Sequence, residues 1–103
     1  MTEKLDIVVK ACEDKIGEDI RVIDISQRSG FADYFVIVTG NGALHTQALA
    51  NEIQDKIEEE GHEILGKEGF REGSWILLDL GEIIVHVFTN EQREFYNLEN
   101  IWD

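Results

Sequence analysis

The sequence has no proline, a single cysteine and only nine lysine and arginine residues among its 103. Without proline or a low-complexity segment no linker is visible, so we expect residues 1–103 to form one domain with one core. Because Cys12 is alone, no intrachain disulfide can form, which fits a reducing compartment. The longest apolar stretches, such as 34–38 and 75–78, fall far short of the roughly 20 residues that span a bilayer. Residues 1–4 match neither a signal peptide nor a transit peptide, so we expect a cytoplasmic protein with no membrane partner.

Basic residues are scarce. Twenty-two acidic residues against nine basic ones give a net charge of −13 and a pI near 4.4. A nucleic-acid binder needs a cationic surface to neutralise phosphates, so the composition argues against direct DNA or RNA binding. A strongly negative field steers a protein toward basic surfaces, and ribosomal proteins are the most abundant of these in a cell. Solubility alone explains the acidity equally well, so the charge excludes more than it identifies.

Hydrophobic periodicity predicts a mixed α/β fold (α+β mixed), with elements in the order α-β-β-α-β-β-β-α. A first helix is expected to end near Gly17, and its apolar stripe comprises Leu5, Val8, Val9, Cys12 and Ile16. Strands are predicted at 20–25 and 33–39. The second of these is almost continuously apolar, so we expect it to be central and covered on both faces.

The remaining elements follow from turn and cap signals. Asn41 is the expected N-cap of a second helix that ends at Gly61, with a buried stripe of Leu49, Ala50, Ile53 and Ile57. A weak strand is predicted at 62–67 and a hairpin at 74–88, turning at Leu80-Gly81. A capping box at 89–92 opens a last helix that runs to the C-terminus, with one side formed by Phe95, Leu98 and Trp102.

The predicted hairpin has two unlike faces. A two-residue loop at Leu80-Gly81 pairs Trp75 with His86 and Asp79 with Glu82. Side chains alternate along a strand, so one face is wholly aliphatic and forms core: Ile76, Leu78, Ile83, Val85 and Val87. The other face is mixed: Trp75, Leu77, Asp79, Glu82, Ile84 and His86. Mixed aromatic and polar faces are typical of protein interfaces. The alternative is that a helix covers this face and Trp75 belongs to the core.

Signals for metal binding or catalysis are weak. The three histidines, His45, His62 and His86, lack ligand spacing, so we expect no metal site and no cofactor. Cys12 lies on the apolar stripe of the first helix and is interpreted as an inert core thiol. No nucleophile elbow of a hydrolase occurs. The turn at 40–42 could receive an anion at a helix N-terminus, but the lysine of a P-loop is missing, and a turn with a cap explains it equally well.

Two sets of motifs resemble the ribosomal silencing factor family, Iojap/RsfS. The first half of the resemblance lies in Asp24-Ile25-Ser26, the segment 32–37, Thr39-Gly40 and His45. The second half is more specific and comprises 75–82, 85–88, Arg93, Tyr96, Leu98-Glu99 and Trp102. The resemblance runs from about Leu5 to Trp102, essentially the whole chain.

The resemblance carries several expectations. It implies a mixed sheet of about five strands flanked by helices, related to the nucleotidyltransferase-like fold. It implies binding to the large ribosomal subunit through large-subunit ribosomal protein fourteen, a basic protein on the face that meets the small subunit. Occupying that face would sterically block subunit joining and lower translation when nutrients are scarce. Family members also tend to form homodimers when free.

Carried over by position, the resemblance gives the candidate contact residues. The first candidates share the mixed hairpin face: Trp75, Leu77, Asp79 and His86. The next lie on the C-terminal helix: Tyr96, Leu98, Glu99 and Trp102. Asp33 and Tyr34 are weaker, because the start of a central strand has structural reasons for its residues. Arg93 is a candidate for orienting the carboxylate of Asp79 rather than for touching a partner.

Two other functions remain open from the sequence. A nucleotidyltransferase holds metal ions with paired carboxylates on a strand after a Gly-Ser turn. No strand here has Asp-x-Asp or Asp-x-Glu, and Gly42 stands where family members often have serine, as Leu44 stands where they often have arginine. We therefore expect no enzymatic activity, and any anion-binding role of that stretch to be lost. A dimeric adaptor with a non-ribosomal partner ranks below ribosome binding only because of the resemblance.

Overall fold

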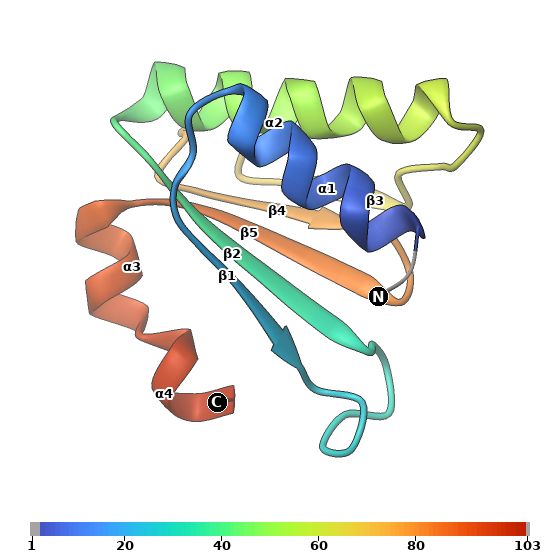
Figure 1. The fold of residues 1–103 in the computed structure, drawn as a ribbon. Coiled ribbons are helices and arrows are strands. Elements are labelled where there is room, and N and C mark those ends of the chain that lie inside the picture. Colours follow the sequence, from blue (N-terminus) through green and yellow to red (C-terminus); the bar gives the residue numbers. More distant parts are fainter. Residues whose placement is uncertain (1–2, 103) are drawn as a thin grey trace.

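A five-stranded sheet carries helices on both faces in the computed structural model, which describes residues 3–102 (Figure 1). The elements in chain order are α1 Glu3–Asp14, β1 Glu18–Asp24, β2 Tyr34–Gly40, α2 Ala43–Glu59, β3 Gly66–Glu68, β4 Trp75–Asp79, β5 Ile83–Thr89, α3 Asn90–Tyr96 and α4 Leu98–Trp102. The strand order is β1-β2-β5-β4-β3. Among the strands that the structure describes, only β2 and β5 pair in parallel, so the sheet is mixed, and the predicted fold class is confirmed.

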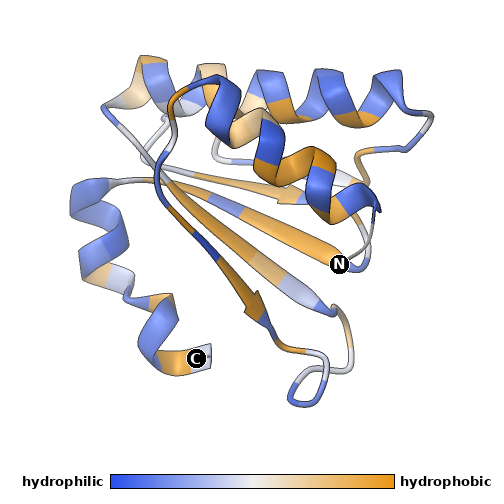
Figure 2. Ribbon diagram, in the orientation of Figure 1, coloured by the Kyte–Doolittle hydropathy of each residue, from blue (hydrophilic) through white to orange (hydrophobic). Residues whose placement is uncertain are grey.

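One face of the sheet is covered by α1 and α2, which lie side by side above it in Figure 1. The buried residues of this layer form the larger core, in which Leu5, Val8, Leu49, Ile53 and Ile57 meet Val36, Val38, Ile76, Leu78, Val85 and Val87. Figure 2 shows hydrophobic strands beneath helices whose outer surfaces are hydrophilic. Cys12 is fully buried in this core, and burial raises the pKa of its thiol to about 12. A thiol held protonated at neutral pH is a poor nucleophile, as expected from its place on the stripe.

The opposite face is covered only in part. α3 contacts β5 and β2, and a second, smaller core lies beneath α3 and α4, made of Ile23, Ile25, Ala32, Phe35, Ile37, Ile84 and Phe88. On β4 the side chains that alternate toward this face are only half-buried, whereas Ile76 and Leu78 on the other face are fully buried. β3 and much of β4 are therefore left open on this side.

The ends of the first two helices differ from prediction. α1 ends at Asp14, and Ile16 adopts a left-handed conformation with φ of 57° and is 77% exposed, so it does not belong to the buried stripe. Ala11 takes its place. The predicted N-cap of α2 is also wrong. Gly42, with φ of 116°, is the N-cap residue, while the Asn41 N–H donates to Nδ1 of His45 over 2.7 Å.

The hairpin register is shifted from the predicted one. The Leu80 N–H donates to the Ile83 carbonyl over 2.9 Å, so the two-residue loop is Gly81-Glu82 rather than Leu80-Gly81. Gly81 has φ of 94°, a conformation that suits glycine at the first position of such a loop. Trp75 consequently pairs with Phe88, and His86 pairs with Leu77. Because the pairing moves by two residues, the residues that share each face are those predicted.

The predicted last helix is two helices. Asn97 ends α3 in a left-handed conformation with φ of 49°, and α4 leaves in a new direction. Phe95 is therefore 77% exposed instead of lying on a buried side with Leu98 and Trp102, which do pack on the second core. Thr89 is the N-cap of α3, but its side chain makes no capping hydrogen bond, so the expected capping box is not formed.

Candidate functional site

The uncovered half of the sheet is the candidate site, and we call it the open face. It consists of Glu68 from β3, Trp75, Leu77 and Asp79 from β4, and Phe95 and Tyr96 from α3. The antiparallel register sets Glu68 directly beside Leu77, so the two side chains point to the same side of the sheet. The sheet and α3 thus bring together one exposed phenylalanine, one half-exposed tyrosine, a tryptophan and two carboxylates.

Trp75 is the centre of the open face, and its ring is held on several sides. Its indole lies 4.9 Å from the ring of Phe88 and 4.5 Å from that of Tyr96. Its Nε1–H donates to Nδ1 of His86 over 3.1 Å. The one polar group of the indole is satisfied inside the protein, so the surface that remains exposed is the aromatic ring itself.

His86 lies beneath Trp75 rather than on the surface, being only 4% exposed. Its ring meets that of Phe35 edge-on, with 4.6 Å between the centroids. Burial without a charged partner lowers the pKa of His86 from 6.5 to about 4, so the imidazole is neutral at physiological pH. Since Nδ1 accepts from Trp75, the proton lies on Nε2.

Arg93 does not contact Asp79, so the prediction that it orients this carboxylate is wrong. Its Nε donates to Oε1 of Glu99 over 2.7 Å, and its Nη1 donates to the Asp19 carbonyl over 2.6 Å and to the Thr39 hydroxyl over 2.8 Å. Arg93 is 7% exposed and needs a charged partner inside the protein, which α4 supplies through Glu99. Asp79 instead accepts the N–H of Gly81 over 2.9 Å and so stabilises the hairpin turn.

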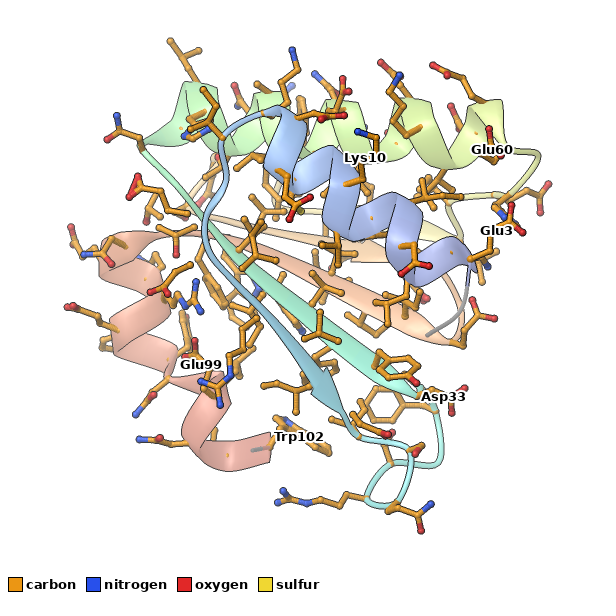
Figure 3. All side chains as sticks on the ribbon, viewed as in Figure 1. Glu3, Lys10, Asp33, Glu60, Glu99 and Trp102 are labelled. Atoms are coloured by element: carbon orange, nitrogen blue, oxygen red, sulfur yellow. The ribbon has the colours of Figure 1, made fainter. Side chains whose placement is uncertain are left out.

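The other predicted residues on α4 fasten this helix to the sheet. Figure 3 shows Glu99 and Trp102 turned toward the strands. The Trp102 ring meets Phe35 at 5.2 Å, and its carbonyl accepts from Nη1 of Arg28 over 2.6 Å. Leu98 packs on the same second core. These residues therefore support the open face from its edge.

The two weaker candidates lie away from the open face. The side chain of Tyr34 packs against the larger core, on the opposite side of the sheet. The backbone N–H groups of Asp33 and Tyr34 both donate to the Glu82 carbonyl, over 2.8 and 3.0 Å. Their backbone contacts join the start of β2 to the hairpin turn.

Two residues of the open face were missed by sequence reasoning. Phe95 was expected on the buried side of an unbroken helix. The helix is broken at the left-handed residue Asn97, and Phe95 is exposed. Glu68 carried no signal, because its place depends on how a three-residue strand pairs with β4. Between them, Glu68, Gly69, Trp75 and Leu77 line a hollow of about 280 Å³ on this face.

The described part of the chain offers neither grouped metal ligands nor a membrane-spanning helix. Among residues 3–102, no three His, Cys, Asp or Glu side chains are grouped so that they could hold a metal ion. Both ring nitrogens of His45 are engaged by backbone groups, those of Asn41 and Lys15. None of the helices described is long and apolar enough to cross a membrane.

Comparisons with known proteins agree on one family. The family model described as "Ribosomal silencing factor during starvation", RsfS, matches residues 1–103. The ribosomal silencing factor RsfS of Bacillus subtilis is 46% identical over 98 residues, which cover 95% of this chain and 83% of the relative.

Two crystal structures are also similar. One, of a Chromobacterium violaceum protein, has a TM-score of 0.95 at 35% identity and covers 97% of this chain and 83% of that one. The other, from Bacillus halodurans, has a TM-score of 0.89 at 38% identity and covers 97% and 93%. The chain belongs to the ribosomal silencing factor family, RsfS.

Proposed function

We propose that this protein represses translation by binding the large ribosomal subunit through large-subunit ribosomal protein fourteen, where it sterically blocks joining with the small subunit. It acts by docking and not by catalysis. The observation that carries the proposal is the open face, a fixed tryptophan at the centre of an uncovered half-sheet with aromatic side chains from α3 beside it. Rigid aromatic side chains dominate the binding energy of protein interfaces because they bury a large area at a small entropic cost.

The candidate residues take two roles in this proposal. Direct contacts come from the surface of the open face: Trp75, Leu77, Asp79, Phe95 and Tyr96. The buried residues act through these: His86 fixes the indole, while Arg93, Leu98, Glu99 and Trp102 hold the C-terminal helices at the edge of the face. Asp33 and Tyr34 contribute to the fold and not to the contact.

The charge of the protein favours a basic partner. A net charge of −13 on 103 residues accelerates encounter with a positively charged surface at low ionic strength. The association rate is therefore expected to fall as salt rises, because exposed charges are screened. If the association rate is the same at low and high salt, the net charge does not steer binding. The aromatic contact would then be the only support for the proposal.

The free protein is proposed to be a homodimer that uses the same open face. Phe95 is 77% exposed and Tyr96 is 42% exposed, and two copies could bury both against each other. Binding to the ribosome would then compete with dimerisation. Analytical ultracentrifugation tests this: Phe95→Ala should shift the protein toward monomer, and a dimer that is unaffected by this change uses another surface.

The function is tested by co-sedimentation of the purified protein with isolated large and small subunits, followed by a subunit-joining assay. Binding to the large subunit alone, with fewer joined particles, supports the proposal. Binding with normal joining would keep the partner and overturn the steric mechanism. No binding to either subunit would overturn ribosome binding and favour an adaptor for a non-ribosomal partner.

A further inference from the structure

The hollow on the open face has an acidic wall beside an aromatic wall. Its volume is about 280 Å³, and Glu68, Gly69, Trp75 and Leu77 line it. Gly69 contributes no side chain, so nothing from this position fills the space, and its φ of 77° favours glycine. The hollow is thus open enough to receive one side chain of a partner.

The carboxylate of Glu68 has no bonded partner among the residues that the structure describes. Within residues 3–102, no hydrogen bond or ion pair involves its carboxylate. The adjacent lysine, Lys67, points to the opposite side of the sheet, where its Nζ contacts Oε1 of Gln54 at 2.9 Å and lies over the ring of Phe70. A carboxylate at the rim of a hollow with no internal partner is a ready acceptor for an external cation.

The aromatic wall has the properties of a cation-binding surface. The electron-rich face of tryptophan attracts a cation more strongly than do the other aromatic rings. Trp75 is held by Phe88, Tyr96 and His86, so its orientation does not have to be fixed at the moment of binding. Its N–H is already bonded within the protein and does not repel the incoming donor.

We propose that this hollow receives one arginine side chain of the docking protein, with the guanidinium stacked against the Trp75 indole and paired with the Glu68 carboxylate. This inference rests on the proposed function, because it assigns the chemistry of the group that the open face recognises. Arginine fits better than lysine, since its planar fork can stack on an aromatic ring and donate two hydrogen bonds to one carboxylate. Its guanidinium is also more weakly hydrated than an ammonium group and enters a partly apolar hollow more readily.

The test measures the binding kinetics of purified large ribosomal subunits with the wild-type protein and with two variants. Each variant replaces one glutamate by the neutral glutamine. Glu68→Gln removes the negative charge of the proposed partner, and Glu60→Gln removes the same charge from the end of α2, on the opposite helical layer (Figure 3). A charge that is buried on binding acts on the dissociation rate, whereas an exposed steering charge acts on the association rate. Glu68→Gln should therefore raise the dissociation rate about tenfold or more, the loss typical of a charge-assisted hydrogen-bonded pair, while Glu60→Gln should leave it unchanged.

Two other results would overturn the proposed arginine site. If Glu68→Gln dissociates no faster than Glu60→Gln, the arginine site is overturned while ribosome binding stands. If the wild type does not bind large subunits, the proposed function fails and this inference with it. Glu68 is exposed, so its replacement should not change the stability of the fold. Equal urea midpoints for the wild type and both variants would confirm that neither variant is misfolded.

A chemical footprint identifies the side chain in the hollow. At saturating concentration, the wild-type protein should protect one arginine of the large subunit from phenylglyoxal, and Glu68→Gln should leave that arginine reactive. Protection of a lysine from acetylation in place of an arginine would overturn the choice of arginine.

Discussion

The indole Nε1–H of Trp75 donates to Nδ1 of His86 over 3.1 Å, although the two residues are not opposite each other in the β4–β5 ladder. Trp75 pairs with Phe88, and His86 pairs with Leu77, so the bond runs diagonally across the two strands. A diagonal contact of this kind is within reach of large aromatic side chains. It exists only while Nδ1 of His86 is unprotonated, and the position of the central aromatic ring therefore depends on the charge of a buried histidine.

The first prediction is that stability falls as the pH is lowered from 6.5 to 4. The pKa of His86 is about 4 in the folded protein and 6.5 when the residue is exposed, because burial disfavours the charged ring. In this window the unfolded chain binds a proton that the folded chain does not, so acid favours unfolding. The stabilisation is complete above pH 6.5 and is lost toward pH 4, by roughly 3 kcal/mol in total. Urea unfolding at a series of pH values measures it.

The control for this prediction is His86→Asn, which does not titrate and whose side-chain oxygen can accept from the Trp75 indole. Carboxylates titrate in both proteins, so the difference between them isolates His86. The variant should lose less stability than the wild type between pH 6.5 and 4. Parallel curves for the two proteins would show that His86 does not control the acid sensitivity.

The second prediction separates binding from folding on the open face. Trp75→Ala should weaken binding to the large subunit by about 30-fold or more, as expected for a central aromatic contact. It should also lower stability, since the ring packs on Phe88 and Tyr96. Phe95→Ala should weaken binding without a change in stability, because this ring is 77% exposed. Co-sedimentation and urea unfolding measure the two effects.

Leu44→Ala is the matched control, because Leu44 is 85% exposed at the start of α2 and lies outside the open face. It should change neither property. A Trp75→Ala protein that cannot fold would show that this residue serves mainly the second core. Normal binding by Phe95→Ala would remove α3 from the contact surface.

The third prediction concerns the ion pair between Arg93 and Glu99. Arg93→Met should destabilise the fold by about 3 kcal/mol or more, since it leaves the Glu99 carboxylate, the Asp19 carbonyl and the Thr39 hydroxyl without their donor. Glu99→Gln keeps an acceptor and should cost less. Thermal unfolding with a double-mutant cycle measures the coupling between the two side chains. Additive effects would mean that the pair does not hold α4 on the sheet.

The sequence predicts the two faces of the hairpin well because they depend only on the two-residue period of a strand. Ile76 and Leu78 are core, and Trp75 and Leu77 face the other side, whichever loop joins the strands. The predicted pairing of the two strands was wrong. Both possible loops, Leu80-Gly81 and Gly81-Glu82, contain a glycine, so the sequence does not distinguish them. Choosing between them requires knowing where the positive φ falls, and the structure assigns it to the first loop position.

The network around Arg93 could not be read from the sequence. Arg93 joins Asp19, Thr39 and Glu99, two of which lie more than fifty residues away along the chain. With 22 acidic residues in the chain, nothing local singles out one partner. The burial of His86 was equally hidden, because it depends on α3 packing back over the sheet and on α4 turning toward the second core after the left-handed residue Asn97.

The last prediction concerns Gly69, which directly follows β3 and lines the hollow on the open face. A Cβ at this position would lie 2.1 Å from the Trp75 carbonyl oxygen, and the backbone φ is 77°, so Gly69→Ala adds a clash with the backbone to conformational strain. Gly61→Ala is the control: φ is 84°, but nothing lies within 4 Å of the added Cβ, so it carries the strain alone. Strain of this type costs about 1–2 kcal/mol, and we expect Gly69→Ala to lose at least about 2 kcal/mol more than Gly61→Ala in urea unfolding. A backbone oxygen cannot move aside without disturbing the β3–β4 pairing that sets Glu68 beside Leu77. Equal losses in the two variants would show that β3 can shift away from β4, and the acidic wall of the hollow would then not be fixed in the folded protein.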